Sequence, residues 1–304
     1  MAETELLVTM PVVNPDTGKR SRTFQYMGRL DGMEEPIVIE IKATADPSMY
    51  MFRRTLSYQP ELYAMAARYG GYNVMMIEYR MIVPPQIRLC SKDKSQDDYE
   101  QRCYEWIMDR PDDRLVTHRV TLSIGRTEAA RRYLWACGQR ILVNRRTCVW
   151  IPNGSACDEW SRVCPYKRLC EAASDGADPE TLIDSEYEIV SNSHPEVGSY
   201  GADSGVLTYT GCTVLAQCEQ KYFWMFERNL RRPREDTDAR WLGSAVHAGL
   251  DGFARGGLEQ GRAAIDQWAD ANPILGPEAA DKQIQDIAKA RAMVRAASEK
   301  WGCR

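Results

Sequence analysis

Small and apolar residues recur at every second position in two stretches near the start of the chain. The first stretch contains Leu6, Val8 and Met10, and the second contains Phe24, Tyr26 and Gly28. Because the side chains of a β-strand point alternately to its two faces, this spacing predicts half-buried strands. An apolar run at 37–41 predicts a third strand, and the Asp-Gly and Pro at 31–36 predict the hairpin turn before it.

A helix and a further strand are expected after this hairpin. Apolar residues at helical spacing predict a helix over about 58–68, which the glycine pair at 70–71 ends. The apolar run at 72–83 predicts a strand that stops at the proline pair 84–85. Residues 127–146 have the amphipathic pattern of a long helix.

The pattern changes at residue 171. Residues 171–206 are acidic, are rich in Ser, Gly and Asp, and show little periodicity, so we expect a linker there. Helical segments are expected after it, at 212–230, 240–255, 258–271 and 278–300. They are separated by Pro233, the pair Gly256-Gly257 and Pro273. The first half therefore supplies a sheet and the last third supplies helices, which predicts an α/β fold with a central sheet flanked by helices. The sequence shows no internal repeat.

Composition and charge narrow the function classes. The chain has 304 residues, of which 44% are hydrophobic, enough for one large core or two small ones. Its 39 Lys and Arg are outweighed by 43 Asp and Glu, so nucleic-acid binding would need a local basic patch. Residues 1–7 do not resemble a secretory signal, and no apolar run is long enough to span a membrane. We therefore expect a cytoplasmic protein without a membrane segment.

Ten cysteines are more than structure alone requires in a chain of this size. In a reducing cytosol they are not expected to form disulfides. Cys157, Cys164 and Cys170 fall within fourteen residues, which predicts a metal or cluster site. The others are scattered, and most are expected to be buried as small hydrophobic residues: Cys90, Cys103, Cys137, Cys148, Cys212, Cys218 and Cys303.

The predicted hairpin carries the candidate chemistry. Glu40 and Lys42 are two residues apart, so they point to the same face of their strand. Asp31 precedes the turn, where its carboxylate can approach that of Glu40. Two converging carboxylates repel unless a cation lies between them, and oxygen ligands favour Mg²⁺ or Mn²⁺. Lys42 would then orient or deprotonate a water, or neutralise a phosphoryl oxygen. The alternative is a surface salt bridge on an edge strand.

The next helix strengthens the catalytic interpretation. Gln59 and Tyr63 are four residues apart and share a helix face. Together with Gly28-Arg29-Leu30-Asp31-Gly32 and the run from Ile37 to Lys42, this pair resembles the RecB-like and Cas4-like branch of the PD-(D/E)xK nuclease superfamily. The resemblance implies a restriction-endonuclease-like core with a mixed β-sheet.

The resemblance also assigns roles to residues. It implies catalytic roles for Asp31, Glu40, Lys42, Gln59 and Tyr63. Metal binding is implied at His247, Asp31, Glu40 and Ile41. Arg53 and Arg54, just before the helix of Gln59, would meet DNA phosphates. The alternative for these two arginines is a solvated helix start.

His247 lies far downstream of Lys42, in the family's Gly-x-x-x-His context after Gly243. A lone histidine on such a helix is otherwise a core residue. Residues 207–210 and Cys218 resemble the opening of the family's domain, whereas residues 1–170 resemble its later part. We interpret this order as a circular permutation, because the two parts are complementary. A truncated second copy would repeat elements, and domain swapping between two chains is the alternative arrangement.

The permutation predicts three regions. Residues 1–170 would hold the core strands, the catalytic hairpin and the three-cysteine group. Residues 171–206 would be the linker, and 207–304 would complete the same domain. In the family the first cysteine and the last three meet at one iron-sulfur cluster, so a linker suffices to join the usual ends.

By this resemblance Cys157, Cys164, Cys170 and Cys218 would hold a [4Fe-4S] cluster with a structural role. The six residues between Cys157 and Cys164 depart from the family's two, so Cys148 and Cys212 are alternatives to Cys157. Four thiolates also suit a tetrahedral Zn²⁺ site, which stays open.

The resemblance implies a Mg²⁺- or Mn²⁺-dependent deoxyribonuclease whose partner is DNA. We expect an exonuclease acting on DNA ends or single strands in recombination, repair or replication, and a phage protein of the host cytoplasm would suit this role. The alternatives are a non-catalytic DNA-binding or scaffold module with the same cluster or zinc, and a zinc-stabilised interaction protein. A retired site usually loses a residue, and His247, Asp31, Glu40, Lys42 and Gln59 are all present, which favours the enzyme. The sequence leaves the oligomeric state open.

Overall fold

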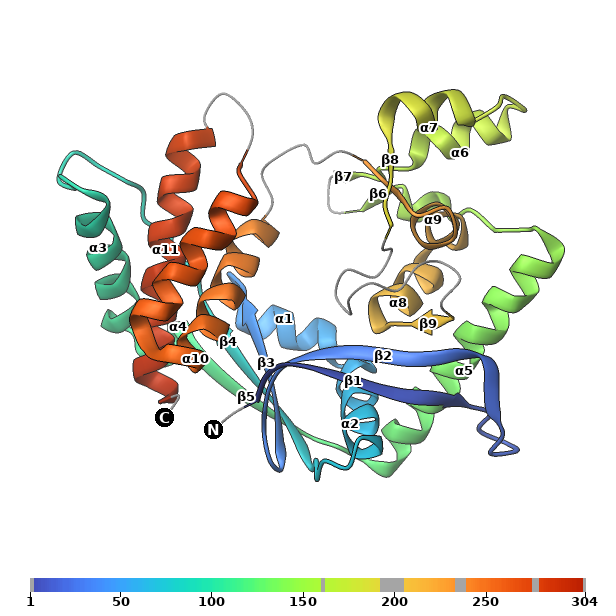
Figure 1. The fold of residues 1–304 in the computed structure, drawn as a ribbon, viewed down its shortest axis with the longest axis horizontal. Coiled ribbons are helices and arrows are strands. Elements are labelled where there is room, and N and C mark those ends of the chain that lie inside the picture. Colours follow the sequence, from blue (N-terminus) through green and yellow to red (C-terminus); the bar gives the residue numbers. More distant parts are fainter. Residues whose placement is uncertain (1–2, 160–161, 192–204, 233–238, 275–278, 303–304) are drawn as a thin grey trace.

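The computed structural model describes residues 3–159, 162–191, 205–232, 239–274 and 279–302 (Figure 1). Its centre is a β-sheet with the strand order β1-β2-β3-β4-β5. These strands are β1 (Glu3–Val13), β2 (Arg20–Glu34), β3 (Ile37–Ala43), β4 (Met76–Ile82) and β5 (Leu115–Thr121). β3 and β4 are parallel, whereas the other neighbours in this order are antiparallel. The α/β fold with a mixed central sheet is therefore confirmed.

The hairpin of β2 and β3 is tighter than the sequence suggested. Glu34 pairs with Ile37, so β2 continues through Asp31 and Gly32 and only Glu35 and Pro36 turn the chain. The alternating pattern of β1 and β2 buries residues such as Val8 and Tyr26 against the helices on one face. Long, regular pairing here fixes the register, because a shift of one residue would expose that apolar face.

Helices α1 (Pro47–Arg54) and α2 (Gln59–Tyr69) connect β3 to β4. α2 confirms the expected helix at 58–68, and its Leu62 and Ala66 are fully buried. The strand expected from residue 72 begins only at Met76. The long helix expected at 127–146 is α5 (Ile124–Thr147), which Ser123 caps by accepting a hydrogen bond from the Arg126 N–H.

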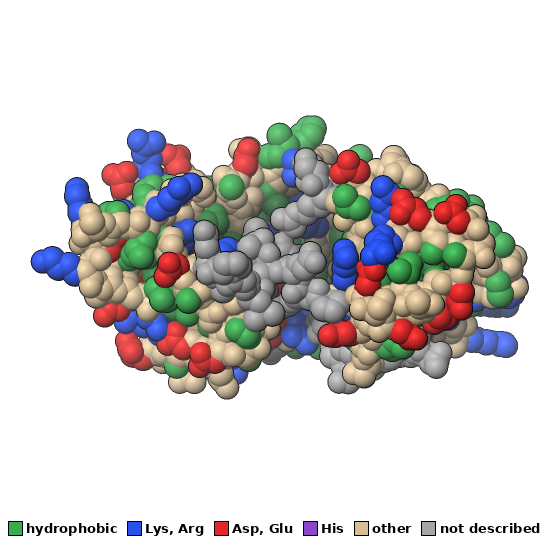
Figure 2. All heavy atoms as spheres, turned by 90° about the horizontal axis from the view of Figure 1, so that it is seen from above, with side chains coloured by type: hydrophobic (Ala, Val, Ile, Leu, Met, Phe, Trp, Pro, Cys, Tyr) green, Lys and Arg blue, Asp and Glu red, His purple; other side chains and the backbone are tan. Residues whose placement is uncertain are grey.

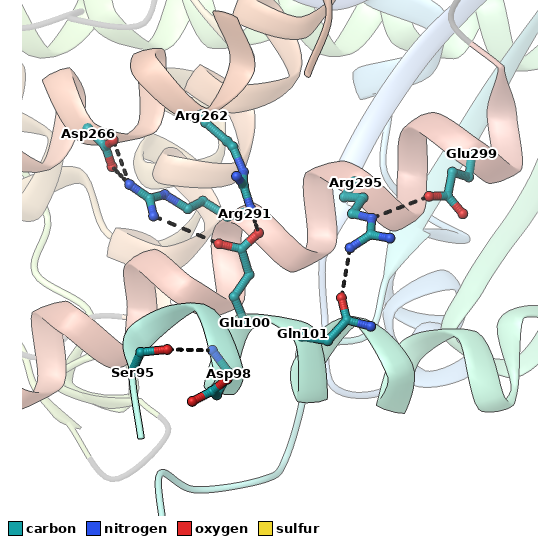
Figure 3. Close-up of polar contacts among 9 residues, drawn as sticks. All are labelled: Ser95, Asp98, Glu100, Gln101, Arg262, Asp266, Arg291, Arg295 and Glu299. Atoms are coloured by element: carbon teal, nitrogen blue, oxygen red, sulfur yellow. Dashed lines mark hydrogen bonds and ion pairs between the residues drawn. The ribbon is translucent and has the colours of Figure 1, made fainter. Parts of the chain in front are cut away.

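Two helices between β4 and β5 were not expected. They are α3 (Gln96–Asp109) and α4 (Pro111–Arg114). α3 packs against the C-terminal helices, α10 (Ala239–Ala271) and α11 (Ala279–Trp301). Figure 3 shows the polar contacts of this interface, in which Glu100 of α3 faces Arg262 and Arg291. The α3 segment is thereby fastened to the far end of the chain.

The C-terminal helices follow the expected pattern in part. α10 is interrupted by non-helical backbone at Gly256 and Gly257, as the glycine pair predicted. Pro273 follows its end, and Pro233 lies outside the described residues. These helices cover the β3–β5 side of the sheet (Figure 1) and form a second core with residues such as Ile82, Val246 and Val294. No helix among the described residues has the length and apolarity needed to cross a bilayer.

A smaller lobe lies at the upper right in Figure 1. It contains η1 (Gly154–Ala156), β6 (Asp158–Glu159), β7 (Arg162–Val163), α6 (Lys167–Ser174), α7 (Glu180–Glu186), β8 (Glu188–Ile189), α9 (Glu219–Tyr222), η4 (Phe223–Glu227) and β10 (Leu230–Arg231). α8 (Tyr209–Gln217) and β9 (Val206–Leu207) join it to the sheet, where β9 runs parallel to β2. Within the expected linker at 171–206, residues 180–189 form α7 and β8. Ile183 and Tyr187 are buried there against Tyr166 and Trp224, whereas residues 192–204 lie outside the described part of the chain.

Candidate metal-dependent active site

The hairpin of β2 and β3 brings three predicted residues together. Gly32 pairs with Ile39, so Asp31 and Glu40 lie opposite each other on adjacent strands. The Lys42 Nζ lies 2.7 Å from Glu40 Oε1 and 3.5 Å from Asp31 Oδ2. The backbone N–H of Ile41 donates to Asp31 Oδ2 at 2.6 Å and fixes this carboxylate. Local sequence order alone is therefore enough to build this half of the site.

Burial shapes the electrostatics of the group. Glu40 is only 2% exposed, and burial raises its pKa to about 7, with the charge of Asp31 acting in the same direction. Burial alone would lower the pKa of Lys42, but the charges of Asp31 and Glu40 outweigh it and raise that pKa. Burial would raise the pKa of Asp31, yet Lys42, His247 and the Ile41 N–H together lower it. Lys42 thus serves as the counter-ion of two buried carboxyl groups.

Helix α2 completes the surroundings of Glu40. Gln59 Nε2 donates to the Tyr63 hydroxyl at 2.8 Å and lies 3.5 Å from Glu40 Oε1. Arg54 Nη1 donates to Gln59 Oε1 at 2.7 Å, so this predicted DNA-binding residue is held at the site. Gly28 makes room for this arrangement, because a Cβ there would lie 2.8 Å from Tyr63 Cε1.

The second predicted DNA-binding residue has a different position. Arg53 is exposed on the solvent side of α1, whereas Arg54 turns inward. The Arg54 guanidinium lies over the Tyr50 ring, 4.9 Å from its centroid. The two arginines therefore occupy different sides of one short helix, and Arg54 contacts Gln59, a neighbour of Glu40.

His247 arrives from the opposite end of the chain. Its Nδ1 lies 3.6 Å from Asp31 Oδ1, while Lys42 and Ile41 contact the other oxygen of that carboxylate. α10 approaches β3 closely, and Val246 and Ile41 pack in the same core. Gly249, two residues after His247, allows this packing, because a Cβ there would lie 2.7 Å from Ile265 and Val294.

Glu5 is a candidate ligand that sequence reasoning missed. Its neighbours Thr4 and Leu6 pair with Gly32 and Leu30, so Glu5 faces Asp31 across the β1–β2 ladder. One ligand atom from each of Glu5, Asp31 and His247 lies within 4.8 Å of the others. Burial raises the pKa of Glu5, as does the charge of Asp31. The alternating pattern of β1 predicts a strand but gives no role to its polar residues. Glu5 lies beside Asp31 only because of the register in which β1 pairs with β2, which the local sequence does not specify.

The donors fit a hard divalent cation. Mg²⁺ binds six ligands at about 2.1 Å, so adjacent donors lie about 3 Å apart and opposite donors about 4.2 Å apart. The observed separations of 3.6 Å and at most 4.8 Å are close to these values. Within the described structure, Glu40 Oε2 is buried and has no hydrogen-bond partner, as expected of an oxygen that a cation would satisfy. Carboxylate oxygens with an imidazole nitrogen suit Mn²⁺ as well as Mg²⁺.

The four predicted cluster cysteines also approach one another. Burial raises the pKa of both Cys164 and Cys170, and the charges of Cys157 and Cys218 act on both in the same direction. The backbone N–H of Asn153 lies 3.3 Å from Cys218 Sγ, to which it donates. This is a common environment for a metal-bound sulfur. All four thiols belong to the smaller lobe or its edge.

The two alternative cysteines lie elsewhere. Cys212 is buried in the main core, where it forms a hydrogen bond with Cys137. Cys148 is exposed after the end of α5, and its Sγ faces the Arg145 carbonyl at 3.8 Å. Their surroundings are therefore those of a core thiol and a surface thiol.

Comparison with known proteins gives one finding. The family model described as the PD-(D/E)XK nuclease superfamily matches residues 206–302. No curated protein and no solved structure matches the chain. The matched residues include α8, α10 with His247, and α11, and they do not include the β2–β3 hairpin. Through its C-terminal third the chain is therefore similar to the PD-(D/E)XK nuclease superfamily, a group of metal-dependent hydrolases of phosphodiester bonds.

Proposed function

We propose that this protein is a Mg²⁺- or Mn²⁺-dependent deoxyribonuclease, acting as an exonuclease on DNA ends or single strands. The observation that carries the proposal is the meeting of His247 with Asp31. The first belongs to the segment that matches the nuclease superfamily, and the second lies outside it, beside Glu40 and Lys42. The site combines residues of both parts of the chain. The expected side chains are all present, namely His247, Asp31, Glu40, Lys42 and Gln59, which favours an enzyme over a non-catalytic scaffold.

Each residue has a definite role in the proposed reaction. Asp31, Glu40, His247, Glu5 and Ile41 would hold the cation. When bound, the cation supplies charge to the scissile phosphate and lowers the pKa of a coordinated water. The remaining steps fall to the residues of the chain itself.

Lys42 supplies the mobile positive charge of the site. Its ammonium group has three donors and contacts both carboxylates, so a small movement brings it to an incoming phosphoryl oxygen or a water. Gln59 and Tyr63 form a rigid pair that keeps Glu40 in place, and Arg54 supports Gln59. Rigid neighbours of this kind hold reacting groups within the narrow tolerance that catalysis requires.

We also propose that the chain is a circularly permuted form of the superfamily's domain, with parts 1–170 and 207–304 joined through 171–206. The matched segment begins at residue 206, where β9 joins the edge of β2. Two observations support a single domain: α10 packs on β3, and Thr4 Oγ1 donates to Asp251 Oδ1 at 2.8 Å. Domain swapping would place these contacts between two chains.

A third part of the proposal concerns the cysteines, which we infer to hold a [4Fe-4S] cluster. Four sulfurs around one Zn²⁺ at about 2.3 Å would lie about 3.8 Å apart. Among the described residues, no three cysteine sulfurs lie within 4.8 Å of one another, which favours the larger cluster. The cluster would fasten α6 to the start of α9, and hence join the two proposed parts of the domain.

The nuclease proposal is tested with end-labelled single-stranded, duplex and closed-circular DNA in the presence of Mn²⁺. The wild-type protein should degrade linear DNA, and Lys42→Ala and His247→Ala should lose most of this activity. Lys92→Ala is a matched control, because Lys92 is exposed and belongs to a loop outside the site. Closed circles have no ends, so their cleavage would show that the protein is an endonuclease and not an exonuclease. Wild-type protein without metal-dependent cleavage of any substrate would leave only the DNA-binding scaffold.

The cluster is tested by the colour and iron content of anaerobically purified protein. A brown protein whose visible absorbance is lost in Cys170→Ala is expected. Cys90→Ala should keep the colour, because Cys90 is exposed and belongs to the loop before α3. A colourless wild-type protein with stoichiometric zinc would show that the four thiolates hold zinc instead.

A further inference from the structure

Helix α1 has two faces of different character. Its inner face carries Tyr50 and Arg54, four residues apart, and both reach toward the active site. The Tyr50 ring meets that of Tyr79 edge-on at 6.2 Å, and Arg54 holds Gln59 at 2.7 Å. Since Gln59 lies 3.5 Å from Glu40, Arg54 is two polar contacts away from a proposed metal ligand. This inner face is fully explained by the proposed nuclease site.

The outer face is apolar and open. Met49 and Phe52 are three residues apart and share one side of α1, and Leu56 follows four residues after Phe52, just beyond the helix end at Arg54. Thr55 continues the helical path, and its N–H donates to the Phe52 carbonyl at 3.2 Å. Phe52 is 75% exposed and Leu56 is 84% exposed, and no residue of α1 is buried. We call these three residues the α1 platform.

Single exposed apolar residues are common on protein surfaces, but a row of them on one short helix is a candidate binding surface. Figure 2 shows hydrophobic side chains gathered at one edge of this face of the molecule, between the two lobes. The platform lies beside the site and is continuous with it, because both use the same helix. Its occupant is therefore expected to be a molecule that also reaches Glu40 and Lys42.

The charge around the platform indicates the chemistry of that molecule. Residues 47–60 contain two arginines, and the two acidic residues that flank them are engaged, because Asp46 accepts from the Met49 N–H and Glu61 pairs with Arg126. Arg53 is exposed next to Phe52. A surface that combines an exposed aromatic ring, an aliphatic side chain and positive charge suits an anion with flat apolar groups.

We propose that the α1 platform binds unpaired bases of single-stranded DNA, with Phe52 stacking on a base and Arg53 facing the backbone. This inference rests on the proposed nuclease function and specifies its substrate. In duplex DNA the base faces are covered by neighbouring bases, whereas a single strand presents them for stacking. The platform therefore selects single strands and leads them past Arg54 to the metal site.

The test measures binding separately from cleavage. Fluorescence anisotropy with a labelled single strand of mixed sequence, in EDTA to prevent metal-dependent cleavage, gives the Kd of each variant. Phe52→Ala should weaken binding about fivefold or more, because stacking on one base contributes at least that factor. The double variant Phe52→Ala/Leu56→Ala should bind still more weakly, and Phe52→Tyr should bind like the wild type.

Two controls separate stacking from charge and from folding. Met75→Ala removes another exposed apolar side chain, just before β4, about 20 Å along the sheet from the level of Lys42. It should leave the Kd unchanged. A strand of equal length made of abasic sites keeps the phosphates and lacks the bases. The wild type should bind it at least as weakly as the double variant binds the normal strand, and Phe52→Ala should cause no further loss on the abasic strand.

The proposal is overturned if the wild type binds the abasic and the normal strand equally, or if Phe52→Ala binds the normal strand like Met75→Ala. It is also overturned if the wild type is a dimer that the double variant converts to a monomer, since the platform would then be an interface between copies. If the platform variants bind the single strand like the wild type and the wild type still cleaves DNA in a Lys42-dependent way, the platform proposal is refuted and the proposed nuclease function stands. A wild-type protein that neither binds nor cleaves DNA refutes the proposed function itself.

Discussion

The contact of Glu100 with two arginines allows a quantitative prediction about how the chain is held together. Glu100 is 2% exposed and lies between Arg262 and Arg291, which belong to α10 and α11 (Figure 3). Glu100→Gln keeps the shape of the side chain and removes its charge. Arg291 keeps a second partner, since both oxygens of Asp266 accept from it at 2.6 Å, whereas Arg262 loses its carboxylate.

The separations give the size of the effect. Arg291 Nη1 lies 3.8 Å from Glu100 Oε2, which corresponds to about 4 kcal/mol of attraction at an effective dielectric constant of about 20. Removing one member of a buried ion pair costs about 3–5 kcal/mol. Because Arg262 is about one-third exposed and water can hydrate it, we expect the lower end, a loss of about 3 kcal/mol in the free energy of unfolding.

The assay is urea unfolding followed by circular dichroism, in which an unchanged slope and a lower midpoint report a loss of stability. Glu299→Gln is the matched control on the same interface. Glu299 is exposed and accepts from Arg295 at 3.4 Å and from the Tyr104 hydroxyl of α3 at 2.6 Å. A glutamine can still accept both bonds, so the substitution should cost less than about 1 kcal/mol. Equal destabilisation by the two variants would refute the argument that burial makes the Glu100 contact the stronger one.

Three further substitutions test the site and its support. Glu5→Gln should weaken Mn²⁺ binding at least tenfold in calorimetry, whereas Glu34→Gln, at the rim of the same pocket, should not. Gly28→Ala should displace the Tyr63 ring and slow DNA cleavage without changing Mn²⁺ affinity, and an unchanged rate would contradict this. Gly205→Ala should cost about 2 kcal/mol of unfolding free energy in urea, because the φ is +64° and the new Cβ would lie 1.9 Å from a β2 carbonyl; wild-type stability would argue against this strain.

Local patterns were sufficient for part of the fold and the site. The strands of the hairpin and helix α2 follow from alternation and helical spacing, and these elements alone position Asp31, Glu40 and Lys42. Gln59 and Tyr63 follow because they are one helical turn apart. The information for this half lies within about forty residues of sequence, where register and turn geometry leave few alternatives.

Other elements carry too little apolar periodicity to be recognised. α1 buries no residue, and α3 buries Glu100 beside Tyr99, which breaks the amphipathic pattern. α3 nevertheless has a start signal, since Ser95 accepts a hydrogen bond from the Asp98 N–H. α7 is short and acidic and is stabilised by the packing of Ile183 inside the smaller lobe, so the sequence of this segment resembles a linker.

The approach of distant segments is a property of the fold. The resemblance to a nuclease family suggested that His247 belongs with Asp31, and the structure puts the two side chains in contact. Nothing in the spacing of these residues indicates this contact. Glu5 was missed for the same reason, because its position beside Asp31 depends on how β1 pairs with β2.

The separation of His247 from the hairpin also sets an order of events during synthesis. About 200 residues lie between Lys42 and His247. At about 5–20 residues per second, the ribosome makes the histidine about 10–40 s after the lysine. The growing chain thus carries its carboxylates long before the imidazole that meets them. Any activity that requires His247 begins only after that residue has been made, and the nucleic acids around the ribosome meet no finished site before then.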